Sequence, residues 1–132
     1  MSKKEIRELV EKAQRSLKAA EILFQQGYND FSISRAYYAM FYSAQALLLT
    51  KEVRRTKHSG IIAAFNELFI HSGQLPHELF ISLRNAFEDR AEGDYGLSTI
   101  SEEQALSGIS EARKFVAEIN MIIESWFGSK AD

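Results

Sequence analysis

Arg90 is the most informative residue for function, because it is a charged side chain on an otherwise apolar helical stripe. It follows Leu79 by eleven positions, which places the two side chains about 20° apart around one helix. Unpaired burial of a charge costs several kcal/mol, so Arg90 must be paired or reach water. One interpretation is that it pairs with Asp94, four residues further on, or extends its charged end past the core. The other is that its guanidinium lies at the rim of a cleft and binds a phosphate or a partner's carboxylate.

A second arginine, Arg35, begins another apolar stretch beside Tyr38 and Tyr42, whose hydroxyls could join it in a polar cluster. That cluster is either a structural network or part of a site. The polar residues on these two otherwise apolar helices are candidates for one ligand-binding site: Arg35, Tyr38, Arg90, Asp94 and Tyr95. The arginines would supply charge-assisted hydrogen bonds, and the tyrosines would supply stacking or hydroxyl contacts.

His58 follows a basic segment, residues 54–57. The segment is either a solvated loop before a helix or a phosphate-binding patch that includes His58. In a patch, Thr56 and the free N–H groups of the helix N-terminus would add contacts. His71 and His77 have no third histidine or carboxylate at ligand spacing, so we expect no metal and no cofactor.

The elements that must position these residues are helices. Apolar spacing predicts five of them, over residues 3–26, from 29 or 30 to 51, 57–71, 76–92 and from 101 to about 126, with no strand. Gly27 is predicted to follow the first helix as its C′ residue, and residues 93–96 are predicted as a loop. Predicted N-caps are Asn29 or Asp30 for the second helix, Thr56 for the third, and Ser101 with Gln104 as a capping box for the fifth.

The second predicted helix is apolar on most sides, which is typical of a helix at the centre of a bundle. Short connections make neighbouring helices antiparallel. We therefore predict an all-α fold, an antiparallel up-down bundle of four to five helices, as a single domain over residues 1–132.

Composition narrows the function classes. The chain has 132 residues, no cysteine, and 16 basic against 18 acidic residues for a net charge of −2. The lack of cysteine excludes disulfides and cysteine-ligated metals. The near-balanced charge argues against a protein that binds duplex nucleic acid over its whole surface. Residues 1–60 carry a net +5 and residues 61–132 a net −7, so a local phosphate site remains open. With no signal core and no apolar stretch of membrane-spanning length, we expect a cytoplasmic protein without membrane contact.

The segment 34–48, SRAYYAMFYSAQALL, resembles the second-helix signature of the HEPN domain superfamily. Residues 57–60, KHSG, and 90–95, RAEGDY, are similar to a pattern in its small stand-alone prokaryotic branch. The order and spacing of these pieces match across residues 5–125. The first motif is fairly specific, and the other two carry weight as a set.

The resemblance implies a helical bundle, often a homodimer, commonly linked to a minimal nucleotidyltransferase partner. Some branches are RNA-cleaving toxins that use an arginine, four to six intervening residues and a histidine, with two sites meeting at the dimer interface. This sequence departs from that pattern, because no histidine follows His77 and Tyr95 stands where one is expected after Arg90. Without an imidazole, proton transfer at the RNA 2′-hydroxyl lacks its usual group.

Three hypotheses follow. The first is a homodimeric HEPN-like module of a toxin-antitoxin or defence-type system, which binds a nucleotide or RNA or docks a nucleotidyltransferase. Its ligand-binding residues would be Arg35, Tyr38, His58, Arg90, Asp94 and Tyr95. The second is a weak metal-independent ribonuclease that uses His58, Arg90 and Tyr95. The third is a protein-interaction module in which these charges only support packing. Enzyme activity is left open, with the missing histidine against it.

Overall fold

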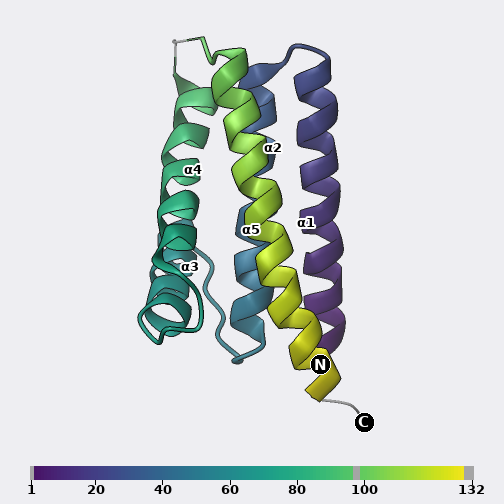
Figure 1. Cartoon of the computed structure of the whole chain (residues 1–132), viewed down its shortest axis with the longest axis vertical. Helices are drawn as coiled ribbons and strands as arrows, with labels where there is room; N and C mark the ends of the chain where they lie inside the picture. The colour runs from purple at the N-terminus through teal and green to yellow at the C-terminus, as the bar shows by residue number, and fades with distance from the viewer. Residues whose placement is uncertain (1, 97–98, 130–132) are drawn as a thin grey trace.

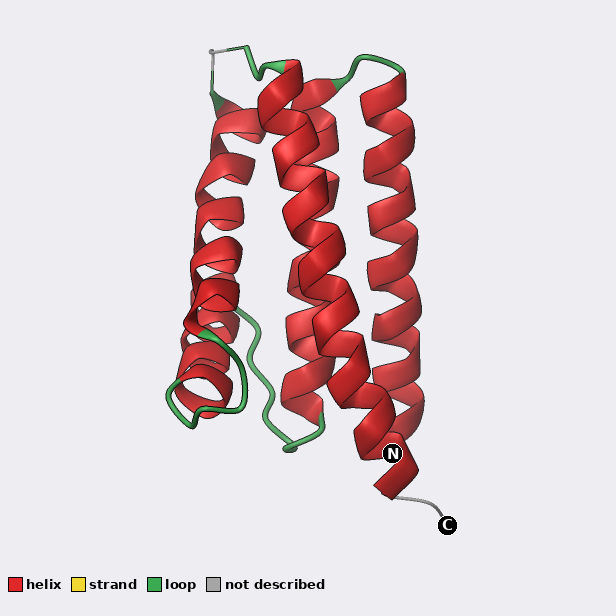
Figure 2. Ribbon diagram, in the orientation of Figure 1, coloured by secondary structure: helices red, strands yellow, loops and turns green. Residues whose placement is uncertain are grey.

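The apolar stripes form four long helices and one short one (Figures 1 and 2). The computed structural model describes residues 2–96 and 99–129. The helices are α1 (Ser2–Gln25), α2 (Asn29–Leu49), α3 (His58–Phe65), α4 (His77–Tyr95) and α5 (Glu102–Ser129), and a π-helical turn, Asn66–Ile70, continues α3. Within these residues there is no strand. The long helices alternate in direction along the chain (Figure 1), which confirms the predicted up-down bundle.

Helix α2 occupies the centre and packs against α1, α4 and α5. Its buried residues surround most of the helix, which is why its sequence shows no single apolar face. The fully buried Ala39 and Ala46 have small side chains, which allow close approach of a neighbouring helix. The central position makes α2 the element that links residues from the other helices.

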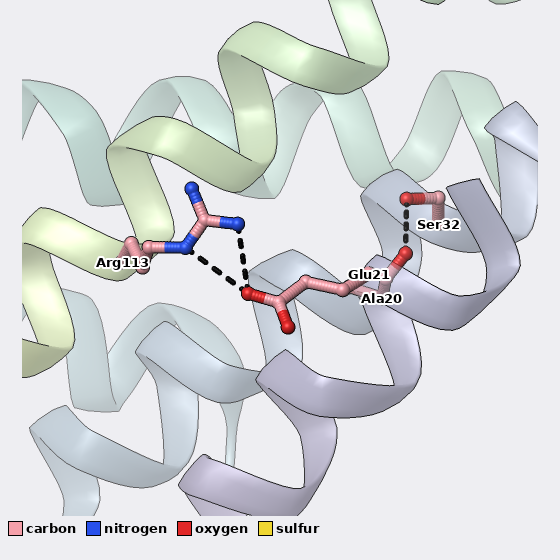
Figure 3. A network of polar contacts seen from close by, with 4 residues as sticks. All are labelled: Ala20, Glu21, Ser32 and Arg113. Atoms are coloured by element: carbon pink, nitrogen blue, oxygen red, sulfur yellow. Dashed lines mark hydrogen bonds and ion pairs between the residues drawn. The ribbon is translucent and has the colours of Figure 1, made fainter. Parts of the chain in front are cut away.

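Polar contacts join α1 to α2 and α5 (Figure 3). The buried Ser32 hydroxyl of α2 donates to the Ala20 carbonyl at 2.8 Å. Arg113 of α5 donates twice to one carboxylate oxygen of Glu21 in α1, at 2.8 and 3.0 Å. The ion pair is largely exposed and contributes little energy, whereas the serine bond satisfies a buried hydroxyl.

Two predicted helix ends are confirmed. Gly27 has a φ of 86°, and the Tyr28 N–H donates to the Leu23 carbonyl at 2.9 Å, as in a glycine-terminated helix. Ser101 and Gln104 form the predicted capping box, with reciprocal bonds of 2.9 and 3.0 Å. Both arrangements depend on residues close in sequence.

Two predicted N-caps are wrong. Tyr28 is the N-cap of α2, and the Asn29 side chain instead donates to the Ile100 carbonyl at 3.2 Å, ahead of α5. Lys57 is the N-cap of α3 and makes no side-chain cap, so Thr56 lies one residue too early. In the first case the Asn29 side chain bonds a distant acceptor instead of capping α2. In the second case α3 begins one residue later than predicted, so Thr56 is not at the cap position.

The predicted loop over residues 93–96 is also wrong, because α4 continues to Tyr95. Gly93 is required by packing and not by a turn. A Cβ there would lie 2.9 Å from the Asp30 carbonyl oxygen and 3.0 Å from Ile33. Glycine therefore lets the last turns of α4 approach the start of α2 closely. No helix in the described part of the chain is long and apolar enough to cross a membrane.

Candidate phosphate-binding site

Arg90 lies among aromatic rings between α4 and α2. Its guanidinium carbon is 5.4 Å from the ring centre of Phe87, 5.6 Å from that of Tyr37 and 5.9 Å from that of Tyr95. These are distances at which a cation is attracted by a ring face. The side chain is 14% exposed, so the inward direction predicted from its spacing is confirmed.

The carboxylate of Asp94 satisfies only part of this guanidinium. One Asp94 oxygen accepts from Nη1 of Arg90 at 3.4 Å, a long bond. The Nε atom of Arg90 is buried and has no hydrogen-bond partner. A guanidinium has five N–H donors, and ring faces accept none of them in the plane. Arg90 therefore keeps donors available for an oxyanion.

His58 is packed against the same aromatic group. Its Nδ1 and the Tyr37 hydroxyl share a hydrogen bond of 2.6 Å, and its ring stacks on Phe41 with centres 4.3 Å apart. Burial lowers the pKa of His58, and the positive charge of Arg90 lowers it further. Burial also raises the pKa of the Tyr37 phenol, although Arg90 opposes this effect. Both effects on the His58 pKa favour the neutral imidazole, and among the described residues its Nε2 makes no hydrogen bond.

A polar and aromatic strip continues from this group along the outer side of α2. Tyr38 lies 5.7 Å from His58 between ring centres, and the guanidinium of Arg35 lies 4.6 Å from the Tyr38 ring centre. One turn further along α2, the ammonium of Lys12 lies 4.7 Å from the Tyr42 ring centre. Tyr38 thus connects Arg35 to the residues around Arg90, and the cations lie over ring faces instead of bonding hydroxyls.

The structure brings five of the six predicted residues into one continuous group and places Arg35 at its edge, in contact with Tyr38. His58 is separated by packing from the basic segment before it. Within that segment Arg54 forms a two-bond ion pair with Glu5 at 2.6 and 2.8 Å. Residues 54–57 are exposed, as a solvated loop would be, while His58 points inward.

Sequence reasoning missed three aromatic residues of the site, Tyr37, Phe41 and Phe87. Tyr37 is fully buried and contacts both Arg90 and His58. The spacing of Tyr37 and Phe41, one helical turn apart, does place them on one face of α2. No spacing within α2 could have shown that α3 and α4 supply their partners. No group of three metal-binding side chains lies among the residues described.

A family model, described as the HEPN domain, matches residues 6–122. The chain belongs to the HEPN family. It is 43% identical over 104 residues to "Putative toxin MJ0142" of Methanocaldococcus jannaschii, covering 78% of this chain and 71% of the relative. It is 37% identical over 122 residues to "Putative toxin MJ0605" of the same organism, covering 92% and 91%. A UPF0332 protein of Thermotoga maritima is 38% identical over 114 residues, covering 86% of each chain.

Membership confirms the resemblance noted in α2. Tyr95, which occupies the expected histidine position after Arg90, is 77% exposed. The nearby imidazole comes instead from α3, since His58 contacts the same Tyr37 ring as Arg90. In this HEPN domain, Arg90 and His58 therefore lie close together in space, although they do not form the arginine–histidine sequence motif.

Proposed function

We propose that this HEPN domain is a homodimeric, toxin-like module that binds the phosphate of a nucleotide or RNA at Arg90. The observation that carries the proposal is the incomplete pairing of Arg90. Asp94 supplies one long hydrogen bond to Nη1, and Nη2 makes none with the described residues and is not among the buried unpaired atoms. A phosphate can accept two parallel bonds from a guanidinium, and such pairs are stronger than neutral hydrogen bonds.

The surrounding side chains suit the rest of a nucleotide. Tyr95 is exposed and lies beside Arg90, so a base can stack on its ring. The open Nε2 of His58 can donate to a phosphate oxygen. For RNA, the strip over Tyr38 to Arg35 offers a second ring and a second cation. We assign Asp94 the role of orienting Arg90.

The homodimer rests on family resemblance and on the surface of α2. Phe31 is 54% exposed and lies one turn before Arg35 on the same strip. An exposed aromatic residue next to a ring-and-cation strip is typical of an interface. In a two-fold dimer the strips of both copies would face each other and bring two Arg90 sites together.

Isothermal titration with ATP, GTP and a short single-stranded RNA tests the proposal. We expect Arg90→Ala to weaken binding roughly tenfold or more, the loss of a charge-assisted pair. Arg84→Ala is the matched control, because Arg84 is exposed on the same helix and lies over Phe80 at 5.6 Å. If none of the ligands binds, or if both variants bind equally well, the phosphate site is wrong. A variant that loses only stability would instead support a packing role.

A ribonuclease is the second candidate function, supported by the neutral imidazole near Arg90. The open Nε2 of His58 could accept the proton of a 2′-hydroxyl, while Arg90 stabilises charge on the phosphate. Cleavage of RNA in EDTA that is lost in His58→Gln would establish it. Absence of turnover at high protein concentration would leave binding alone. Docking of a nucleotidyltransferase is tested separately, by co-purification of that partner with wild-type protein and with Arg90→Ala.

A further inference from the structure

We propose that the groove between α4 and α5 is a docking site for a cationic amphipathic helix of a partner protein. The groove has a volume of about 760 Å³ and lies between residues 77–89 of α4 and residues 103–111 of α5. A helical segment of that α4 length spans about 18 Å. The groove is therefore long enough to hold about three turns of a helix.

The half-buried residues that line the groove include small and apolar ones. Ala86 of α4 and Gly108 of α5 are small, and Ile81 contributes a larger apolar side chain. Gly108 carries no side chain, and a Cβ there would meet only Ile33, at 3.6 Å. Small residues at this position allow the backbone of an incoming helix to approach closely, and helix-in-groove binding uses such surfaces.

The walls of the groove are acidic. Glu78 and Asp89 lie on the α4 wall, and Glu103 and Glu111 lie on the α5 wall. No lysine or arginine is among the described residues that line it. Glu111 accepts a hydrogen bond from Ser82 across the groove, whereas the other three form no ion pair with any residue the structure describes. Burial raises the pKa of Asp89, and Glu88 raises it further, as expected for a carboxylate that lacks a cation.

This charge pattern selects the occupant. RNA and anionic membrane surfaces would be repelled by four carboxylates. A second copy in an isologous contact would bring an equally acidic groove against the first. A helix with lysine or arginine on its polar side and small or aliphatic residues on its other side matches both the walls and the base. The partner is therefore a protein segment of opposite charge.

The docking site is separate from the phosphate site. Asp89 and Arg90 are adjacent in sequence, but their side chains point about 100° apart around α4. A small cavity of about 50 Å³ at one end of the groove reaches Tyr37, the ring that also contacts Arg90. The two surfaces are neighbours divided by one buried side chain, and neither proposal requires the other.

The probe is a fluorescein-labelled helical peptide of about 18 residues with leucine and alanine on one face and lysine on the other. It is titrated with the full chain, and fluorescence anisotropy is recorded at about 50 mM and about 300 mM NaCl. We expect binding that weakens roughly tenfold at the higher salt concentration. A peptide with glutamate replacing lysine should not bind.

Three variants locate the binding site. Glu78→Gln/Asp89→Asn/Glu103→Gln should weaken binding roughly tenfold or more. Glu8→Gln/Glu11→Gln/Glu67→Gln changes net charge equally at exposed carboxylates on other surfaces, and should stay within about twofold. Ser107→Trp keeps every carboxylate but fills the groove, and should also abolish binding. Circular dichroism confirms that each variant is folded.

Each other outcome overturns the proposal. Equal weakening by both triple variants would show unspecific charge attraction. Normal binding by Ser107→Trp would place the peptide outside the groove. Self-association that disappears in the groove variant, with no peptide binding, would identify a second copy as the occupant. Arg90→Ala should leave peptide binding unchanged, so failure here and failure of the phosphate site are distinguishable.

Discussion

The hydrogen bond between Tyr37 and His58 offers a sharp test of how the site is held together. Tyr37→Phe removes one hydroxyl from a fully buried ring and leaves the ring contacts with Phe41, Phe87 and Arg90 in place. The hydroxyl lies 2.6 Å from Nδ1 of His58. Tyr37 is fully buried, so the vacated position is not open to bulk solvent.

The expected loss follows from this geometry. Removing a hydrogen-bonding partner from a buried group costs about 1–3 kcal/mol, because the remaining group is left unsatisfied. His58 is only half-buried, so the lower half of that range applies, and we expect about 1.5 kcal/mol. For a domain of this size, that loss lowers the melting temperature by about 5 °C.

Urea unfolding followed by circular dichroism measures the loss, with an unchanged m-value showing that the unfolded state is the same. Tyr42→Phe is the matched control. Tyr42 lies on the same helix, is half-buried, and its hydroxyl makes no hydrogen bond with the described residues. It should lose less than about 0.5 kcal/mol. A double-mutant cycle with His58→Gln should return most of the Tyr37 effect as coupling energy.

Two results would refute this reasoning. If Tyr37→Phe and Tyr42→Phe lose equal free energy, the short bond to His58 contributes nothing specific. If Tyr37→Phe is strongly destabilising and its effect does not depend on His58, the hydroxyl acts through another contact. In either case the imidazole is held by stacking on Phe41 and not by the phenol.

Burial lowers the pKa of His58, so the stability from its neutral ring is complete above about pH 6.5 and decreases as pH falls through its folded pKa. The difference in unfolding free energy between wild type and His58→Gln should therefore change from about pH 7.5 to about pH 5.5. A constant difference over this range would contradict the prediction. Gly93→Ala should cost about 1–3 kcal/mol in urea unfolding because its Cβ would lie 2.9 Å from the Asp30 carbonyl oxygen. Gly128→Ala, with nothing within 4 Å, should be neutral or slightly stabilising in the same assay, and equal costs would refute the packing argument. Ser101→Ala should lose about 1 kcal/mol of unfolding free energy, because it removes the hydroxyl that caps α5, and no loss would mean that the cap is dispensable.

Local patterns predicted the helices and some of their ends. The capping box at Ser101 and the glycine end at Gly27 were found because their hydrogen bonds join residues a few positions apart. Asn29 was misassigned because its amide reaches Ile100, 71 positions away. Gly93 was wrongly predicted as a loop residue because the Asp30 carbonyl that excludes a side chain there is also far away in sequence.

For the candidate site too, helical spacing predicted some features, whereas others depend on how the helices pack. Helical spacing predicted that Arg90 points inward and that Asp94 lies one turn away. The buried phenol of Tyr37 was not predicted as a site residue, although it lies between Arg90 and His58. Its role depends on three helices meeting, and periodicity within one helix contains no information about the register of another.

Three properties could be read from the amino-acid order alone: an all-α bundle with α2 at its centre, membership of the HEPN family through the α2 motif, and the lack of a histidine after His77. These properties depend on periodicity and residue order. The packing of the helices, in contrast, places His58 beside the Arg90 cluster and gathers four carboxylates along one groove. Both depend on how helices pack, and packing is set by the combined shape of many side chains that are far apart in sequence.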